Sequence, residues 1–173
     1  MTTPTPTIRP ATPADAVQLA AFVERVFRET FAADNRSADM AAYCAEAFGP
    51  AHQLADIEAA GVHTLLVECG GLAGCAQVQA GTPPPCVTAD RAIELRRFYI
   101  DTPWHGRGIA QQLMRAVMEV AAATGAGSVW LGVWERNARA IAFYAKCGFA
   151  DVGAHDFRLG DDLQTDRVMV VGL

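Results

Sequence analysis

The sequence predicts a mixed α/β fold, of the α+β type, in which one mixed sheet has helices on both faces. Its 173 residues are enough for one domain with a sizeable core. Strand-like runs on either side of Gly70-Gly71 predict an antiparallel hairpin. A strand–helix–strand order over 93–133 predicts a parallel crossover, because parallel neighbours need a long connection. The sheet is therefore expected to contain both strand directions.

The N-terminal region is predicted to begin with a tail, a short strand and a helix. Residues 1–6 are uncharged and rich in Thr and Pro, so we expect a flexible tail there and a single domain over 7–173, starting with a strand at 7–9. Thr12 before Pro13 marks a helix start, with a capping residue and a proline in the first turn. The apolar face of this helix is expected to contain Val17, Leu19, Ala20, Phe22, Val23, Val26 and Phe27.

Two shorter helices are expected next. Asp34-Asn35 ends the first helix, and Ser37 is the expected cap of a second that runs to Phe48. Gly49-Pro50 separates it from a third helix that ends near Gly61.

The hairpin is expected to pair the strands 63–69 and 72–79. A two-residue turn at Gly70-Gly71 would place Cys69 opposite Leu72 and Cys75 opposite Leu66. A disulfide between the two cysteines is then not expected. The chain has five cysteines without a CxxC pair or a metal-type spacing. With no signal peptide in the sequence, we expect reduced thiols, a cytoplasmic protein and no bound metal.

Alternating strands and helices are predicted for the rest of the chain. The expected elements are a strand at 93–100, an amphipathic helix at 107–124, a buried strand at 128–133, a helix at 137–147 that ends at Gly148, and strands near 150–157 and 165–171.

Charge and hydropathy exclude some classes of partner. The net charge of −5 argues against nucleic acid and mildly favours a cationic substrate. Apolar runs are short compared with the ~20 residues of a membrane span, so no membrane partner is expected.

The stretch from Trp104 to Ala110 carries the clearest functional signal. Its two glycines lie between a strand and a helix, so backbone N–H groups at the helix start are left without partners. Those donors and the positive end of the helix dipole favour a bound anion such as a diphosphate. A dinucleotide fingerprint does not fit, because Gln111 stands where its third glycine is needed, and the Gly-Lys-Ser/Thr of a P-loop is missing. A turn without any ligand stays open on this evidence alone.

Two segments together resemble the GNAT superfamily of N-acetyltransferases. Leu95 to Ile100 followed by Gly106-Arg-Gly-Ile-Ala110 resembles its motif A, although His105 stands where Gln or Arg is usual. Asn137-x-x-Ala-x-x-Phe-Tyr-x-Lys-x-Gly-Phe149 resembles its motif B. The segments 27–31, 130–137 and 153–169 are further similar to the PaiA-type polyamine acetyltransferases.

This resemblance implies a fold, a donor and an acceptor. It implies the GNAT fold, with one central mixed and largely antiparallel sheet that contains a splayed parallel strand pair. It also implies acetyl-CoA as co-substrate and a small-molecule amine, with a polyamine first, as acceptor. Dimers are frequent in the superfamily, so a homodimer is one expected state. The residues implied for binding the cofactor are Phe98, Tyr99, Ile100, His105, Gly106, Arg107, Gly108, Ile109, Ala110, Asn137 and Lys146.

Acetyl transfer requires a proton donor for the leaving thiolate and a way to remove a proton from the acceptor ammonium. Tyr144 is the candidate acid, since Asn137 and Tyr144 share one helical face. Asn137 can equally be a helix cap. An ammonium has a pKa near ~10.4, so Glu94 or Glu135 is expected to act as a base through water.

The acceptor site is expected to use acidic and aromatic side chains. Glu29 and Asp166 are candidates to bind a cationic acceptor, and Trp134 can add a cation–π contact. The alternatives are an acetyltransferase for an amino acid, a drug or a protein N-terminus, and a non-catalytic acyl-CoA-binding sensor.

Overall fold

The computed structural model describes residues 5–173. Residues 1–4 of the predicted tail therefore lie outside the described residues. Three short 3-10 segments, Pro13–Asp15, Ala32–Asp34 and Thr102–Trp104, connect the main elements. In chain order these elements are β1 (Thr7–Pro10), α1 (Ala16–Phe31), α2 (Ser37–Ala47), α3 (Pro50–Glu58), β2 (Val62–Glu68), β3 (Leu72–Gln79), β4 (Ala92–Ile100), α4 (Ile109–Ala123), β5 (Ser128–Trp134), α5 (Ala138–Lys146), β6 (Ala150–Leu159) and β7 (Asp162–Gly172).

Within residues 5–173 the strands form one seven-stranded sheet in the order β1-β2-β3-β4-β5-β7-β6. Every neighbouring pair is antiparallel except β4 and β5, which are parallel. The helix α4 connects these two parallel strands, as the strand–helix–strand pattern predicts. The predicted mixed, largely antiparallel sheet is confirmed.

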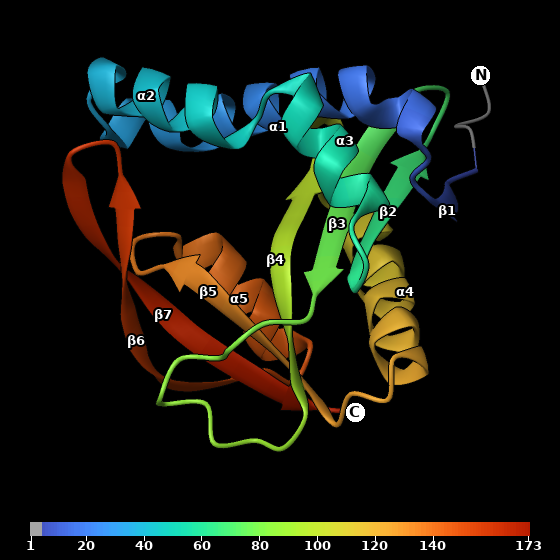
Figure 1. Ribbon diagram of the computed structural model, residues 1–173, viewed down its shortest axis with the longest axis vertical. Helices are drawn as coiled ribbons and strands as arrows, with labels where there is room; N and C mark the ends of the chain where they lie inside the picture. Colours follow the sequence, from blue (N-terminus) through green and yellow to red (C-terminus); the bar gives the residue numbers. More distant parts are fainter. Residues whose placement is uncertain (1–4) are drawn as a thin grey trace.

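The parallel pair holds together at one end and opens at the other. β4 pairs with β5 at Ala92–Ser128, Ile93–Val129 and Glu94–Trp130, and beyond these pairs the strands separate (Figure 1). From there β4 continues along β3 to Ile100, while β5 continues along β7 to Trp134. The separated halves therefore each keep one backbone edge free of a sheet partner, and these edges face each other across the fork.

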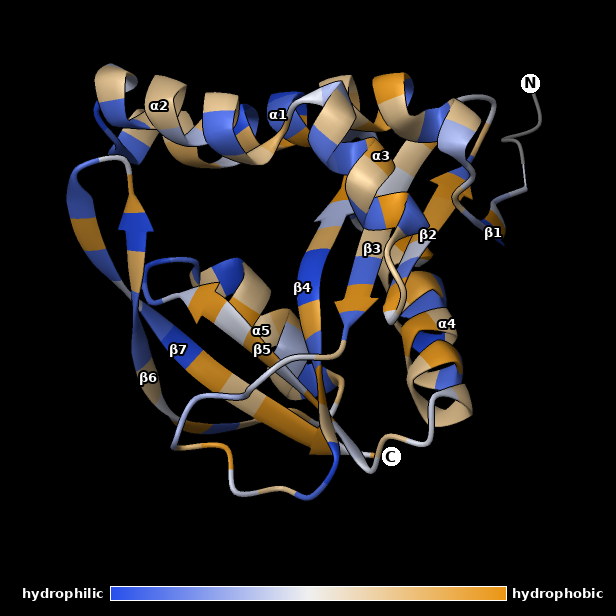
Figure 2. Cartoon of the chain, in the orientation of Figure 1, coloured by the Kyte–Doolittle hydropathy of each residue, from blue (hydrophilic) through white to orange (hydrophobic). Residues whose placement is uncertain are grey.

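Helices pack on both faces of the sheet. In β2, Leu65 and Val67 belong to the apolar cluster that contains α4, whereas Leu66 belongs to the cluster that contains α1 and α2. This alternation is the two-residue period of a strand buried on both sides. Figure 1 shows α1 and α2 lying side by side, away from α4 and α5. Hydrophobic and hydrophilic residues alternate in bands along α4, as an amphipathic helix requires (Figure 2).

Four local predictions need correction. Val17 is 69% exposed, because it lies on the outer side of α1. Ser37 is the first residue of α2 rather than its cap, and Arg36 takes the capping position. The helix α4 starts at Ile109 instead of 107, because Gly108 has a left-handed conformation with φ of 78°.

The fourth correction concerns the hairpin. Cys75 pairs with Leu66 as predicted, but Leu72 pairs with Glu68 instead of Cys69. The turn contains one more residue than a two-residue turn, since the N–H of Cys69 donates to the carbonyl oxygen of Gly71 at 2.8 Å. A register shift next to Glu68 absorbs the extra residue. All five cysteines are free.

Candidate active site

A cleft of about 390 Å³ occupies the fork between β4 and β5. Its walls come from α1, α2, β4, the glycine turn, β5, α5, β6 and β7, so distant parts of the chain meet there. The residues predicted for the site that line this cleft are Phe98, Tyr99, Ile100, His105, Gly106, Gly108, Ala110, Trp134, Asn137, Tyr144 and Asp166.

The glycine turn forms a cradle of main-chain donors at the start of α4. Gly106 and Gly108 both have left-handed conformations, with φ of 72° and 78°. The Gln112 N–H is bonded to the Gly108 carbonyl oxygen at 3.2 Å, so the N–H groups at 109–111 precede the first intrahelical bond. A Cβ at Gly106 or Gly108 would meet no atom within 4 Å. The turn therefore leaves open space in front of its donors, which fits a pyrophosphate.

His105 makes its contacts inside the protein. Its Nε2 lies 2.8 Å from the carbonyl oxygen of Ile100, and the Arg139 guanidinium donates to its Nδ1 at 2.9 Å. Nδ1 is thus the acceptor, and Nε2 carries the proton that it donates to Ile100. Its backbone N–H also bonds to Thr102. His105 therefore positions Arg139, which lines the cleft, and its own donors are already used.

The free edge of β4 lines the same cleft as the glycine turn. Phe98, Tyr99 and Ile100 line the cleft, and they pair with β3 on their other side. A register shift opposite Gln77 and Val78 leaves Arg96 as an extra residue in β4. Such a bulge bends the strand and increases its twist. It therefore contributes to the separation of β4 from β5, which leaves main-chain groups of β4 available to a ligand.

Tyr144 reaches the cleft from α5. It is 9% exposed, and its ring packs against Phe98, Phe143 and Phe149 with centroid distances of 6.1, 5.6 and 5.7 Å. Burial raises the pKa of Tyr144 above the ordinary phenol value. The phenol therefore keeps its proton at neutral pH and remains available as a donor.

Asn137 and Trp134 also line the cleft. The Asn137 side-chain oxygen accepts the Ala140 N–H at 3.2 Å, so it caps α5 while its residue lines the cleft. The Trp134 ring contacts Phe31 edge-on at 5.8 Å. The Arg136 guanidinium lies 5.8 Å from the centre of the Trp134 ring, so a cation already occupies one approach to this indole.

Six other predicted residues are not among those that line the cleft. Glu29 forms an ion pair with Arg25 at 3.2 Å, and Glu94 accepts a 2.6 Å hydrogen bond from Gln79. Arg107 lies over the ring of Trp104 at 5.4 Å. Ile109 is buried in the core below the turn. Glu135 and Lys146 are exposed.

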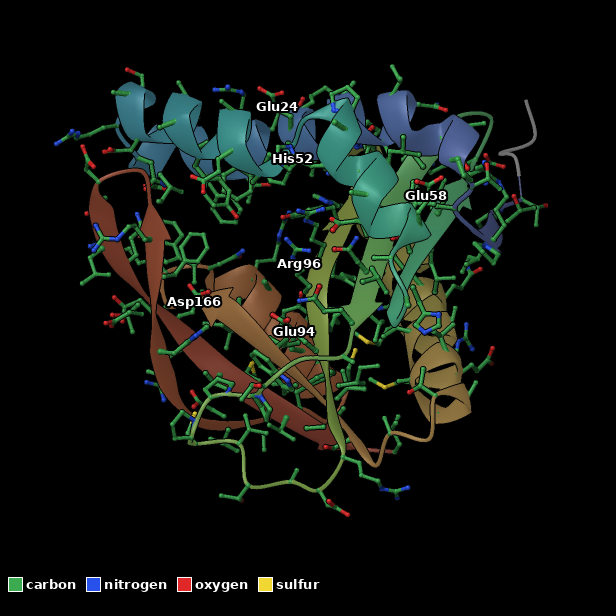
Figure 3. All side chains as sticks on the ribbon, in the orientation of Figure 1. Glu24, His52, Glu58, Glu94, Arg96 and Asp166 are labelled. Carbon is green, nitrogen blue, oxygen red and sulfur yellow. The ribbon has the colours of Figure 1, made fainter. Side chains whose placement is uncertain are left out.

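Asp166 comes from β7 and is 13% exposed. Burial raises the pKa of this carboxyl from its ordinary value to about 6. Figure 3 shows Asp166 on the β7 side and Arg96 on the β4 side of the space that both residues line.

Sequence reasoning missed the two arginines of β4. Arg97 is 8% exposed and donates to Asp56 at 3.2 Å and to Gln53 at 3.3 Å. Arg96 reaches the same carboxylate at 3.3 Å. One carboxylate shared by two guanidiniums leaves a net positive charge on this wall of the cleft. Arg96 and Arg97 are adjacent in the sequence, but the direction in which their side chains point depends on the bulge in β4.

Other classes of site find no candidate in the described part of the chain. Residues 5–173 contain no group of three or more His, Cys, Asp or Glu side chains placed to hold a metal ion. No helix in that range is long and apolar enough to cross a bilayer.

The glycine turn and the free edge of β4 give this cleft main-chain groups that suit a ligand containing a diphosphate. The Acetyltransferase (GNAT) family matches residues 21–149, more than half of the chain, and the chain belongs to that family. The fold is also that of the PaiA N-acetyltransferase from Thermoplasma acidophilum in complex with coenzyme A. That likeness has a TM-score of 0.79 at 17% identity and covers 98% of this chain and 99% of the other.

Two curated relatives add to this result. An uncharacterized N-acetyltransferase of Mycobacterium tuberculosis is 48% identical over 81 residues, which cover 47% of this chain and 52% of the relative. The chain thus spans about half the length of that relative. An uncharacterized N-acetyltransferase of Lactobacillus delbrueckii subsp. lactis is 29% identical over 156 residues, which cover 90% of both chains. These matches confirm the predicted superfamily and the GNAT fold.

Proposed function

We propose that this protein transfers an acetyl group from acetyl-CoA directly to a primary amine of a small molecule, with a polyamine such as spermidine as the leading acceptor. One observation carries the acceptor assignment. Among residues 5–173, Asp166 is the one carboxylate that lines the cleft, and it lies there with the aromatic side chains of Phe31, Tyr43, Trp134 and Phe157. A carboxylate beside aromatic rings suits an organic cation.

Different residues of the chain serve different steps of the proposed reaction. The N–H groups of the glycine turn bind the pyrophosphate of coenzyme A, and the free edge of β4 at Phe98–Ile100 orients the donor. When bound, acetyl-CoA supplies the thioester that the amine attacks. Tyr144 donates its proton to the thiolate that leaves, because its phenol is protonated at neutral pH and borders the same cleft.

A second acceptor class is favoured by the arginines of β4. Arg96 is exposed, lines the cleft and shares Asp56 with the buried Arg97. A spare guanidinium suits a carboxylate. An acceptor with both an amine and a carboxylate, such as an amino acid, would thus place its ammonium toward Asp166 and its carboxylate toward Arg96.

An acceptor panel tests these alternatives. Thiol release from acetyl-CoA is measured with spermidine, spermine, aspartate, other amino acids and short N-terminal peptides. Turnover with the polyamines and little with amino acids is the result expected of a polyamine acetyltransferase. Turnover only with amino acids or peptides would move the assignment to that class. Tight coenzyme A binding without turnover on any amine would indicate the non-catalytic sensor.

A further inference from the structure

His155 and Asp166 form a pair beside the acceptor part of the cleft. They are register partners on the neighbouring strands β6 and β7, and the distance from His155 Nε2 to Asp166 Oδ2 is 3.9 Å. His155 Nε2 is buried and has no hydrogen-bond partner among the described residues. The side chain as a whole is 35% exposed. One end of the imidazole is therefore enclosed beside Asp166, while another part of the ring reaches solvent.

Gly132 on β5 leaves the space that this pair requires. A Cβ at this position would lie 2.7 Å from His155 Nε2 and 3.1 Å from Asp166 Oδ2. Gly132 is not one of the glycines with a positive φ, so backbone conformation does not demand glycine here. The requirement is spatial. Any larger residue would push the imidazole and the carboxylate away from their present positions.

The surroundings make Asp166 a carboxylate with few competing partners. His155 faces it from β6, and Trp134 is its register partner on β5. The other ionisable side chains that line the same cleft within residues 5–173 are Tyr43, Arg96, Arg97, Tyr99, His105, Arg139 and Tyr144. Burial raises the pKa of Asp166 to about 6, so the carboxylate is ionised at neutral pH yet accepts a proton readily.

We propose that Asp166 removes the proton from the acceptor amine and that His155 carries this proton from the cleft to solvent, an inference that rests on the proposed acetyltransferase function. The acceptor ammonium first loses a proton to Asp166. The freed nitrogen then forms its bond to the acetyl carbon and loses a second proton to solvent. The C–S bond of the thioester breaks, and Tyr144 gives its proton to the sulfur. Asp166 then passes its proton to His155 Nε2, and the imidazole releases a proton on its exposed side. Tyr144 regains a proton from solvent.

The present 3.9 Å separation is compatible with this role. A direct hydrogen bond needs about 2.7–3.2 Å, so the imidazole or the carboxylate must move by about 1 Å. Catalytic hydrogen bonds are often longer before substrate binds and shorten in the complex. Within residues 5–173, His155 Nε2 has no other hydrogen-bond partner that would oppose this movement.

The decisive experiment compares pH profiles of kcat and kcat/KM for spermidine between the wild-type enzyme and D166N. Asparagine has the same shape but cannot accept the proton. We expect the wild-type profile to rise through an apparent pKa near 6, that of the Asp166 carboxyl, and then to stay flat to about pH 9. D166N should lose about 100-fold or more in kcat at pH 7.5. Its rate should then rise about tenfold per pH unit, because only the free amine reacts.

Two further variants test the outward path. H155Q should lower kcat because the outward path for the proton is lost, and it should move the acid limb to higher pH because His155 lowers the pKa of Asp166. G132A should shift the profile in the same direction, and thermal melting shows whether it folds. H63Q, at an exposed histidine of β2, is the matched control and should leave both kcat and the profile unchanged.

The outcomes separate the two proposals. A D166N enzyme with a raised KM, an unchanged kcat and the wild-type profile would make Asp166 only an anchor and would overturn the relay. An H155Q enzyme with the wild-type kcat and profile would remove His155 from it. Acetyl-CoA affinity should stay within about twofold in all variants. If the wild-type enzyme itself releases no thiol with any amine, it is the proposed function that fails.

Discussion

Replacing Asp166 by asparagine should stabilise the folded protein at neutral pH. The carboxyl of Asp166 has a pKa of about 6 in the folded protein because burial disfavours its charge, whereas its ordinary pKa is 3.8. A group whose folded pKa is raised contributes stability below its unfolded pKa and loses it as pH rises through the folded value. Above pH 6 the wild-type protein therefore keeps a charge that folding disfavours, and D166N does not.

The size of the expected stabilisation by D166N follows from the pKa shift of Asp166. A rise from 3.8 to about 6 is about two pH units, which corresponds to at most about 3 kcal/mol at pH 7 and above. The side chain is 13% exposed and borders an open cleft, so solvent screens part of this cost. We expect a gain of about 1–2 kcal/mol, or about 2–8 °C in Tm for a chain of this length.

Thermal unfolding of the wild-type protein and D166N between pH 4 and pH 8.5 measures this difference. The two Tm values should converge at pH 4, separate through pH 6 and reach a constant gap above pH 7. The control is D156N, because Asp156 is an exposed carboxylate on the neighbouring strand β6. Its Tm difference should not change with pH. A D166N gap that is absent at pH 8, or that does not vary with pH, would refute the reasoning.

Three other substitutions test the remaining parts of the site. Gly108→Leu should raise the KM for acetyl-CoA at least tenfold, as measured by steady-state kinetics with varied acetyl-CoA. The leucine side chain would enter the open space in front of the turn, and the left-handed backbone at position 108 disfavours any Cβ. Tyr144→Phe should lower kcat while the acetyl-CoA affinity from calorimetry stays nearly constant, and an unchanged kcat would assign the proton to solvent. Asn137→Ala should lower stability by about 1 kcal/mol in urea unfolding, because the bond to the Ala140 N–H is lost.

The features that sequence predicted well are those with local causes. The turn at Gly106 and Gly108 depends on conformations that glycine alone adopts easily, so its residues show directly in the sequence. The cap at Asn137 is likewise set by residues within one turn of helix. The parallel pair followed from the order of elements, since a strand–helix–strand unit permits few topologies.

The features that sequence placed poorly depend on strand register. Glu94 lies near the start of β4, the strand that continues into the cleft, but its pairing with Gln79 on β3 engages its carboxylate there. The bulge at Arg96 then changes which side chains of β4 enter the cleft, and no residue type in this segment predicts a bulge. The approach of His155 to Asp166 requires β6, β7 and the small residue at 132 together. Such contacts are fixed by packing between strands, because a shift of one residue moves every side chain to the other face.

The two halves of the cleft therefore differ in how they can change. In the proposed function, the half of the cleft that binds the donor uses main-chain groups of the glycine turn and β4, whose positions tolerate many side chains elsewhere. The half proposed for the acceptor is lined by residues from α1, α2 and β5–β7, including Asp166, which lie far apart in the chain. Substitutions at the acceptor side chains can alter the amine without disturbing the donor cradle. The same asymmetry explains why the family of this chain follows from short motifs, while its acceptor must be established by tests on Asp166 and Arg96.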